Sequence, residues 1–262
     1  MNMMELIKTR RSVRTFDGRT VSTEDIKKLS AFMATIENPY KIPVEFILLN
    51  AKEHGLFSPV IAGENLYVAA KVARVPHSEE AFGFSFEKMV LCAWSLGIGT
   101  TWIGGTLKRD LFEKAAEVKD NEGMYCVSPL GYPAEEMSKN EVKMRKRILA
   151  NERLSATELF FNKDFNTPLN ITDEKIKDAL EAVRLAPSAA NMQPWRIIKD
   201  GNSFHFYEVK TLSGDWSWDV QKIDIGIALC HFMSMLENSK CTIENPNIAT
   251  SDNVYYIATV IV

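Results

Sequence analysis

The chain has 262 residues, of which 46% are hydrophobic, and this is enough to form one large domain or two small ones. Its 31 basic and 34 acidic residues give a net charge of −3. A broad basic field for nucleic acid or a membrane surface is therefore not expected, and any anion site must be local.

The four cysteines, Cys92, Cys126, Cys230 and Cys241, have no CxxC spacing and lie in or beside apolar segments. They predict reduced, mostly buried thiols rather than disulfides or a zinc site. The N-terminal segment has no apolar signal region, and no window approaches the length of a membrane span. We therefore expect a cytoplasmic protein with no membrane partner.

Histidine spacing predicts no metal site, and no Ser-His-Asp or Cys-His set is evident. His231 lies in an apolar helical segment, where a hydrogen-bonded core histidine is the favoured interpretation.

Apolar periodicity and turn signals predict a first α/β unit. Its expected elements are a short helix over 4–8, a helix after Ser22 or Thr23 with one apolar face, a strand over 44–49, an apolar run over 66–73, a helix from a cap at Ser85 to Leu96 stopped by Gly97, a helix over 110–118, a strand over 124–129 and a turn over 131–133. A basic surface helix over 139–153 then leads to a second unit.

The second unit repeats the first at an offset of 150 residues. Its expected elements are a helix over 173–185 ended by Pro187, a loop, a strand over 195–199, a helix over 220–237 ended by Asn238 and a strand over 255–262. Residues 22–26 fall on 172–176, and 46–48 fall on 196–198. Two similar α/β halves in tandem account best for this pattern.

The segment RRSVR places Arg10, Arg11 and Arg14 within five residues, with Ser12 as a hydroxyl donor. Guanidinium groups match phosphate oxygens in bidentate geometry, so this segment is a candidate phosphate site. The alternative is a solvated basic helix end that complements the helix dipole.

The loop APSAANMQPW over 186–195 follows the helix of the second unit and precedes a strand. Ser188 and Asn191 carry hydrogen-bonding groups, and two alanines keep the loop narrow, so that it can lie against a planar ligand. The alternative is an ordinary helix-to-strand loop.

The glycine-rich stretch over 97–106 does not match GxGxxG and follows a helix, so a Rossmann site is not predicted. Gly104 and Gly105 can let the backbone approach a flat ring, since glycine has no Cβ. The alternative is a tight turn.

The string APSAxNxQPW resembles the signature of the FMN-dependent nitroreductase family, in which it follows an RRSxR motif by a few dozen residues. Here the two motifs lie in opposite halves, which resembles a subgroup with two fused halves. The resemblance implies an α/β (α+β) nitroreductase-like fold whose tandem sheet-and-helix halves, 1–160 and 161–262, form an internal pseudo-dimer.

The resemblance also implies FMN as the cofactor and assigns residues to it. Arg10, Arg11, Ser12 and Arg14 match the positions that bind the FMN phosphate, and Arg14 is also expected to stabilise negative charge at N1–C2=O of the reduced flavin. Ile103, Gly104 and Gly105 match the backbone that faces flavin N5. A further basic contribution is expected from Arg153, with Arg145 in reserve, and the second half contributes Pro187, Ser188 and Asn191.

The implied activity is transfer of hydride from NADH or NADPH, through FMN, to a nitroaromatic, quinone or similar electron-poor acceptor, with no catalytic side chain beyond the flavin. Reductive dehalogenation and flavin fragmentation are alternatives within the fold. A flavin-binding storage or sensor protein, or one that has lost its cofactor, is the non-enzymatic alternative.

The two halves differ at the motif positions. An offset of 150 replaces the RRSVR residues by Phe160, Phe161, Asn162 and Asp164, and replaces the loop residues by Glu37, Asn38 and Lys41. The sequence therefore predicts one FMN per chain and a monomer that binds small molecules.

Overall fold

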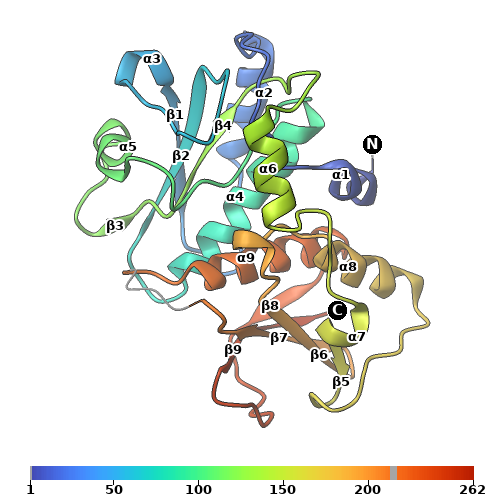
Figure 1. The fold of residues 1–262 in the computed structure, drawn as a ribbon. Coiled ribbons are helices and arrows are strands. Elements are labelled where there is room, and N and C mark those ends of the chain that lie inside the picture. Colours follow the sequence, from blue (N-terminus) through green and yellow to red (C-terminus); the bar gives the residue numbers. More distant parts are fainter. Residues whose placement is uncertain (1, 213–216) are drawn as a thin grey trace.

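The structure is a computed structural model that describes residues 2–212 and 217–262 (Figure 1). Its first sheet contains β1 (Val44–Asn50), β2 (Leu66–Ala73), β3 (Glu122–Gly123) and β4 (Val127–Leu130). Strand β2 pairs antiparallel with the other three, and Phe46 of β1 lies opposite Ala70 of β2. The helices of this half are α2 (Thr23–Met33), α3 (Ala51–His54), α4 (Ser78–Ser95) and α5 (Arg109–Ala115).

The second sheet has the order β5-β6-β7-β9-β8. Its strands are β5 (Phe160–Asn162), β6 (Trp195–Asp200), β7 (Ser203–Val209), β8 (Lys240–Thr242) and β9 (Val254–Ile261). Only β5 and β6 are parallel within this sheet. Helix α8 (Glu174–Arg184), the 3₁₀ turn η1 (Ala189–Asn191) and α9 (Val220–Ser234) complete this half.

Helices α4 and α9 form the centre of the molecule, between the two sheets (Figure 1). Helix α4 packs on β1 and β2, α9 packs on β6, β7 and β9, and the two helices pack on each other. Their backbones meet at two glycines. A Cβ at Gly83 would collide with the carbonyl oxygen of Ile223, and one at Gly226 would collide with that of Glu80. This close crossing joins the apolar cores of the two halves.

The halves share an element order, which is α2-β1-β2-α4-β4 in the first and α8-β6-β7-α9-β9 in the second. In each half, the second strand pairs antiparallel with the first and the third. Among the described helices, α3 and α5 have no counterpart in this correspondence, and three more also lie outside it: α1 (Met3–Thr9), α6 (Lys139–Arg147) and α7 (Ala156–Leu159). Helix α1 contacts both α4 and α8, so the residues that follow it lie where the halves meet.

Local sequence signals placed several helix starts correctly. Ser22 caps α2 by accepting from the backbone N–H of Asp25, and Asp173 caps α8 in the same way. Gly97 ends the α4 segment in the left-handed conformation, at φ 75°, as predicted.

The predicted start of α4 at Ser85 is wrong. The helix begins at Ser78, and Ser85 is buried inside it, where its hydroxyl accepts from the side-chain amide of Asn38. The start has no side-chain cap, so burial of the apolar stretch over 81–84 stabilises this first part instead.

Three predicted helix ends are also wrong. Helix α5 ends at Ala115 rather than at residue 118. The connecting helix α6 ends at Arg147 rather than at residue 153, and Leu149 with φ 50° turns the chain. Helix α9 ends at Ser234, although Asn238 further along has the predicted left-handed φ of 61°. Among the described helices, none combines the length and hydropathy needed to cross a membrane.

Candidate functional site

Two adjoining cavities of about 250 and 360 Å³ lie where the two halves meet. They share five lining residues, Ser12, Arg14, Ile148, Pro187 and Ser188. The smaller one also contains Ile103, Gly104 and Gly105, and we call it the ring cavity. The larger one also contains Arg10, Arg11, Arg145, Arg153 and Asn191, and we call it the basic cavity. Every residue that the sequence motifs assigned to FMN therefore lines one of the two cavities.

Three arginines that line the basic cavity each have one buried nitrogen without a hydrogen-bond partner. These nitrogens are Nε of Arg10, Nη1 of Arg14 and Nε of Arg153. Burial lowers the pKa of all three arginines. Glu87 partly opposes this shift for Arg10 and Glu141 does so for Arg14, while the positive charge of Arg145 lowers all three pKa values further. The pKa of Arg153 falls to about 10, which leaves it protonated at neutral pH. Several buried cations with free donors fit an anion that offers several oxygens.

Arg11 is held differently from its neighbours. Its Nη1 lies 3.3 Å from Oε1 of Glu141, a carboxylate that is fully buried. The other oxygen of Glu141 accepts from the backbone N–H of Arg14 at 3.1 Å and from the Thr15 hydroxyl at 2.8 Å. Glu141 therefore fixes the RRSVR segment on α6 and balances part of the charge of Arg11, which makes Arg11 the weaker anion ligand of the segment.

The glycine-rich stretch lies directly beside RRSVR, because the backbone N–H of Val13 donates to the carbonyl of Thr100 at 2.8 Å. Ile103 forms an antiparallel bridge with Val127. A Cβ added at Gly105 would meet no protein atom within 4 Å, so the space over this backbone is open. The loop can thus present backbone N–H groups to a ligand in the ring cavity.

Arg109 holds the glycine-rich loop in place by hydrogen bonds to backbone carbonyls. Its Nη2 donates to the carbonyls of Gly104 at 3.0 Å and Tyr125 at 3.1 Å, and its Nη1 donates to that of Met124. The guanidinium also lies 5.6 Å from the ring centre of Trp218. Arg109 was not predicted from the sequence, because only the fold brings its guanidinium to the carbonyls of Met124 and Tyr125, which lie between β3 and β4.

Aromatic side chains form the walls of the ring cavity. Trp102, Tyr125 and Trp218 line it, and the rings of Tyr125 and Trp218 have centres 5.5 Å apart. The ring of Trp102 packs on Phe86 with centres 4.7 Å apart. Flat apolar walls suit a planar aromatic group. These three residues were not predicted from the sequence, although Trp102 lies two residues before the glycine pair.

The loop from the second half has an unusual backbone. Ala190, Asn191 and Gln193 have positive φ values of 49°, 59° and 51°. Asp224 of α9 stabilises the loop, since both its carboxylate oxygens accept from the backbone N–H of Ala189 at 3.0 and 3.2 Å. Asp224 also lines the ring cavity, and burial raises its pKa. Such strained backbone persists only where neighbouring groups fix it, and it is common at functional sites.

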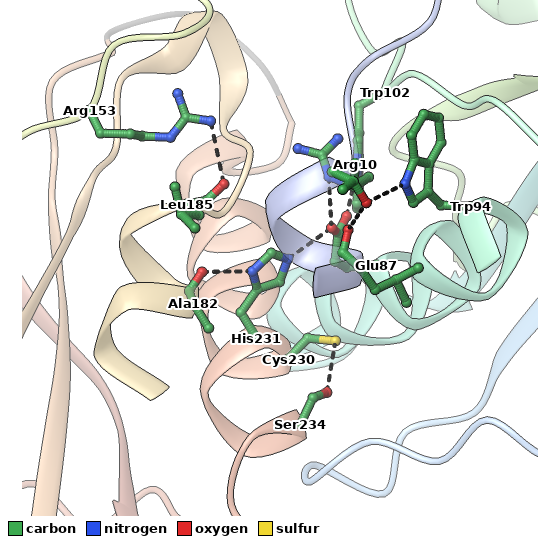
Figure 2. Close-up of polar contacts among 12 residues, drawn as sticks. Arg10, Glu87, Trp94, Trp102, Arg153, Ala182, Leu185, Cys230, His231 and Ser234 are labelled. Atoms are coloured by element: carbon green, nitrogen blue, oxygen red, sulfur yellow. Dashed lines mark hydrogen bonds and ion pairs between the residues drawn. The ribbon is translucent and has the colours of Figure 1, made fainter. Parts of the chain in front are cut away.

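Asn191 faces the basic cavity, and the structure gives its amide partners within the chain. Its Oδ1 accepts from Nη1 of Arg153 at 3.2 Å, and its Nδ2 donates to the carbonyls of Leu149 and Glu152 at 2.9 and 3.0 Å. Arg153 also donates to the carbonyl of Leu185 at 3.3 Å (Figure 2). Asn191 thus orients Arg153 in the basic cavity, and a direct contact with a planar ligand stays a prediction.

A buried polar cluster under the two cavities was also missed. The side chain of Glu87 on α4 is fully buried, and its carboxylate lies between Arg10, Trp102 and His231 (Figure 2). His231 is a hydrogen-bonded core histidine, as predicted, because Nδ1 bonds to the carbonyl of Ala182 at 2.8 Å and Nε2 to Glu87 at 2.9 Å. The four cysteines are free thiols. Within residues 2–212 and 217–262, no group of three His, Cys, Asp or Glu side chains is arranged to bind a metal.

The family model described as "Putative TM nitroreductase" matches residues 2–236 of this sequence. The chain belongs to this nitroreductase family. A protein from Archaeoglobus fulgidus named "Putative NADH dehydrogenase/NAD(P)H nitroreductase" is 27% identical over 51% of this chain and 86% of its own length. A protein of the same name from Methanothermobacter thermautotrophicus is 30% identical over 52% of this chain and 79% of its own length.

A solved nitroreductase structure from Thermotoga maritima superposes on the whole chain. It has a TM-score of 0.64 at 18% identity and covers 100% of this chain and 94% of its own. The nitroreductase fold inferred from the sequence motifs is therefore confirmed.

Proposed function

We propose that this nitroreductase is an FMN-dependent oxidoreductase that takes reducing equivalents from NADH or NADPH. The electron acceptors are nitroaromatics, quinones or similar electron-poor compounds. One observation carries the proposal: buried arginine donors without partners lie beside a flat aromatic cavity, and the same two motifs line both.

The chain's residues fit the two ends of FMN. Arg10, Arg14, Arg153 and Ser12 would hold the phosphate in the basic cavity, and Arg14 also lines the ring cavity, near the pyrimidine end of a bound flavin. The combined space of the cavities lies within the roughly 300–1,000 Å³ typical of small-molecule sites. FMN supplies the two-electron chemistry when bound, and the protein supplies binding, orientation and electrostatics.

The remaining groups orient reactants and exclude water. Of the predicted residues Ile103, Gly104 and Gly105, the two glycines would present backbone N–H groups to flavin N5, because the space over Gly105 is open. The N–H of Ile103 already donates to the carbonyl of Val127 at 2.9 Å. Trp102, Tyr125 and Trp218 line the ring cavity and would surround the face of the flavin ring that meets a planar reactant. Nicotinamide and acceptor would then use the same face in turn.

We further infer that residues 1–160 and 161–262 form an internal pseudo-dimer with one flavin site in a monomeric, cytoplasmic protein. The shared element order of the halves supports this. The two curated relatives also match only about half of this chain while being covered over most of their own length. Within one chain, RRSVR and the glycine loop come from the first half and the APSAAN loop from the second.

Spectroscopy of the full-length protein with FMN tests this function. We expect a bound flavin spectrum that NADH or NADPH bleaches without oxygen and that a nitroaromatic or quinone restores. A protein that binds FMN but resists reduction is the non-catalytic flavin binder instead. Failure to bind FMN at micromolar concentration would refute the proposal.

A further inference from the structure

The carboxylate of Glu87 contacts both ends of the candidate site. Its Oε1 lies 2.9 Å from Nε2 of His231 and 3.8 Å from Nε of Arg10. Its Oε2 accepts from the indole N–H of Trp102 at 3.1 Å. Arg10 belongs to the basic cavity and Trp102 to the ring cavity, so one buried side chain connects the two (Figure 2).

The hydrogen bonds of His231 fix the charge of its pair with Glu87. Nδ1 faces the carbonyl oxygen of Ala182, which can only accept, so Nδ1 carries a hydrogen. One further hydrogen joins Nε2 to Oε1 of Glu87. Whichever of the two atoms holds it, the pair has no net charge, as imidazolium with carboxylate or as imidazole with carboxylic acid.

The zero net charge of the Glu87–His231 pair decides how much Glu87 weakens the positive charge of Arg10. A lone carboxylate at 3.8 Å would cancel the charge of Arg10 and make it useless to an anion. Because His231 balances Glu87, the three side chains together keep one positive charge. Arg10 is also only 5% exposed and lines the basic cavity, so its charge acts on an anion bound there with little screening by water.

We propose that Glu87 is a positioning residue for the flavin phosphate. Its carboxylate orients the guanidinium of Arg10 through their ion pair. Because His231 balances the charge of Glu87, the positive charge of Arg10 stays uncompensated. This inference rests on the proposed function, since it assumes that FMN occupies the two cavities. Glu87 touches no ligand itself and acts through Arg10.

A comparison of FMN with riboflavin, which lacks the phosphate, tests this role in the full-length apoprotein. Glu87→Gln keeps an acceptor for Trp102 and a donor for His231 and removes only the anionic oxygen that faces Arg10. We expect FMN affinity to fall roughly tenfold, because Arg10 loses the buried ion pair at 3.8 Å that orients it. Riboflavin affinity should change less than about twofold, because that ligand makes no phosphate contact.

Three controls separate this role from a structural one. Glu53→Gln, on the exposed side of α3, should alter neither affinity. Arg10→Ala should remove the effect of Glu87→Gln on FMN. His231→Gln leaves Glu87 as an unbalanced carboxylate beside Arg10, so it should also weaken FMN and spare riboflavin, which provides a test even if Glu87→Gln does not fold.

Several results would overturn the inference. They are an equal loss for both flavins, no loss for FMN in either variant, or a full effect of Glu87→Gln without Arg10. In the wild-type protein, nitrogen NMR should show a hydrogen on Nδ1 of His231, and its absence would refute the charge count independently of any variant. Wild-type protein that fails to bind FMN would instead refute the proposed function.

Discussion

Nη1 of Arg153 donates a hydrogen bond to Oδ1 of Asn191 at 3.2 Å, and this contact joins the linker between the halves to the second-half loop. Arg153 precedes the second sheet in the chain, and Asn191 follows α8. Asn191, which lies 38 residues later in the chain, thus helps to hold the guanidinium of Arg153 in the basic cavity.

Asn191→Ala should therefore weaken FMN binding through Arg153. The loss of one charge-assisted hydrogen bond is worth about 1.5–3 kcal/mol, so we expect the Kd for FMN to rise at least about tenfold. Fluorescence titration measures this, and circular dichroism should show an intact fold. The matched control is Asn170→Ala, at an exposed loop position. Unchanged FMN affinity in Asn191→Ala would mean that its hydrogen bond does not position Arg153 for the phosphate.

Arg14→Ala should affect both affinity and redox behaviour. Arg14 lines both cavities and has a buried Nη1 without a partner, so its removal deletes a donor to the ligand. We expect about ten- to hundredfold weaker FMN binding and a lower flavin reduction potential, because a positive charge near N1–C2=O favours the reduced form. Arg19→Ala on the surface is the control. A potential equal to that of the wild type would place Arg14 away from the flavin ring.

The motif pair and the helix caps could be predicted from the sequence, because they depend on local chemistry. Ser22 and Asp173 start helices through their own side chains, and RRSVR and the APSAAN loop carry recognisable strings. The wrong start of α4 had a non-local cause, since the segment before Ser85 is helical only through burial in the centre of the molecule.

The residues that support the site could not be predicted from local sequence patterns, because their contacts join segments far apart in the chain. Glu87 and His231 are 144 residues apart and meet only because α4 and α9 cross at Gly83 and Gly226. No local pattern marks Arg109 either, because its role depends on the hydrogen bond from its guanidinium to the carbonyl of Gly104.

Buried Glu208 on β7 should give the protein a distinct pH dependence. Burial first, and then the charge of Asp219, raise the pKa of Glu208 to about 7 in the folded protein. The folded state therefore holds a proton that the unfolded chain releases near pH 4.5. The stabilisation from this proton is complete below about pH 4.5 and is lost as the pH rises through about 7.

Glu208→Gln removes this proton exchange. Relative to the wild type, the free energy of unfolding of the variant should increase between pH 4.5 and 7 by on the order of 1–3 kcal/mol and then stay level. Urea unfolding at pH 5, 6, 7 and 8 measures the difference. Glu24→Gln, at an exposed carboxylate, should show no such trend. A difference that is independent of pH would mean that Glu208 is ionised throughout.

Steady-state kinetics test whether donor and acceptor share one face of the ring cavity. If both reactants meet the same face of the proposed flavin, beside Trp102, Tyr125 and Trp218, nicotinamide must leave before the acceptor enters. Double-reciprocal plots at several fixed acceptor concentrations should give parallel lines. Intersecting lines would indicate a ternary complex and would count against a shared site.

The two halves differ at the positions that would form a second site. Phe160 is buried, and Asp164 accepts from the backbone N–H groups of Asn166 and Thr167 in a turn. In the first half, at a position that corresponds to the APSAAN loop, Asn38 is buried and donates to the carbonyl of Ile42. These positions offer no cluster of cations for a phosphate dianion.

The number of FMN molecules per chain, measured together with the mass in solution, tests the account most directly. Native mass spectrometry of the reconstituted full-length protein should show a monomer with one FMN. The reason is that RRSVR and the APSAAN loop of the same chain line a shared pair of cavities. Two FMN molecules per chain, or an obligate dimer with flavin bound between chains, would contradict it.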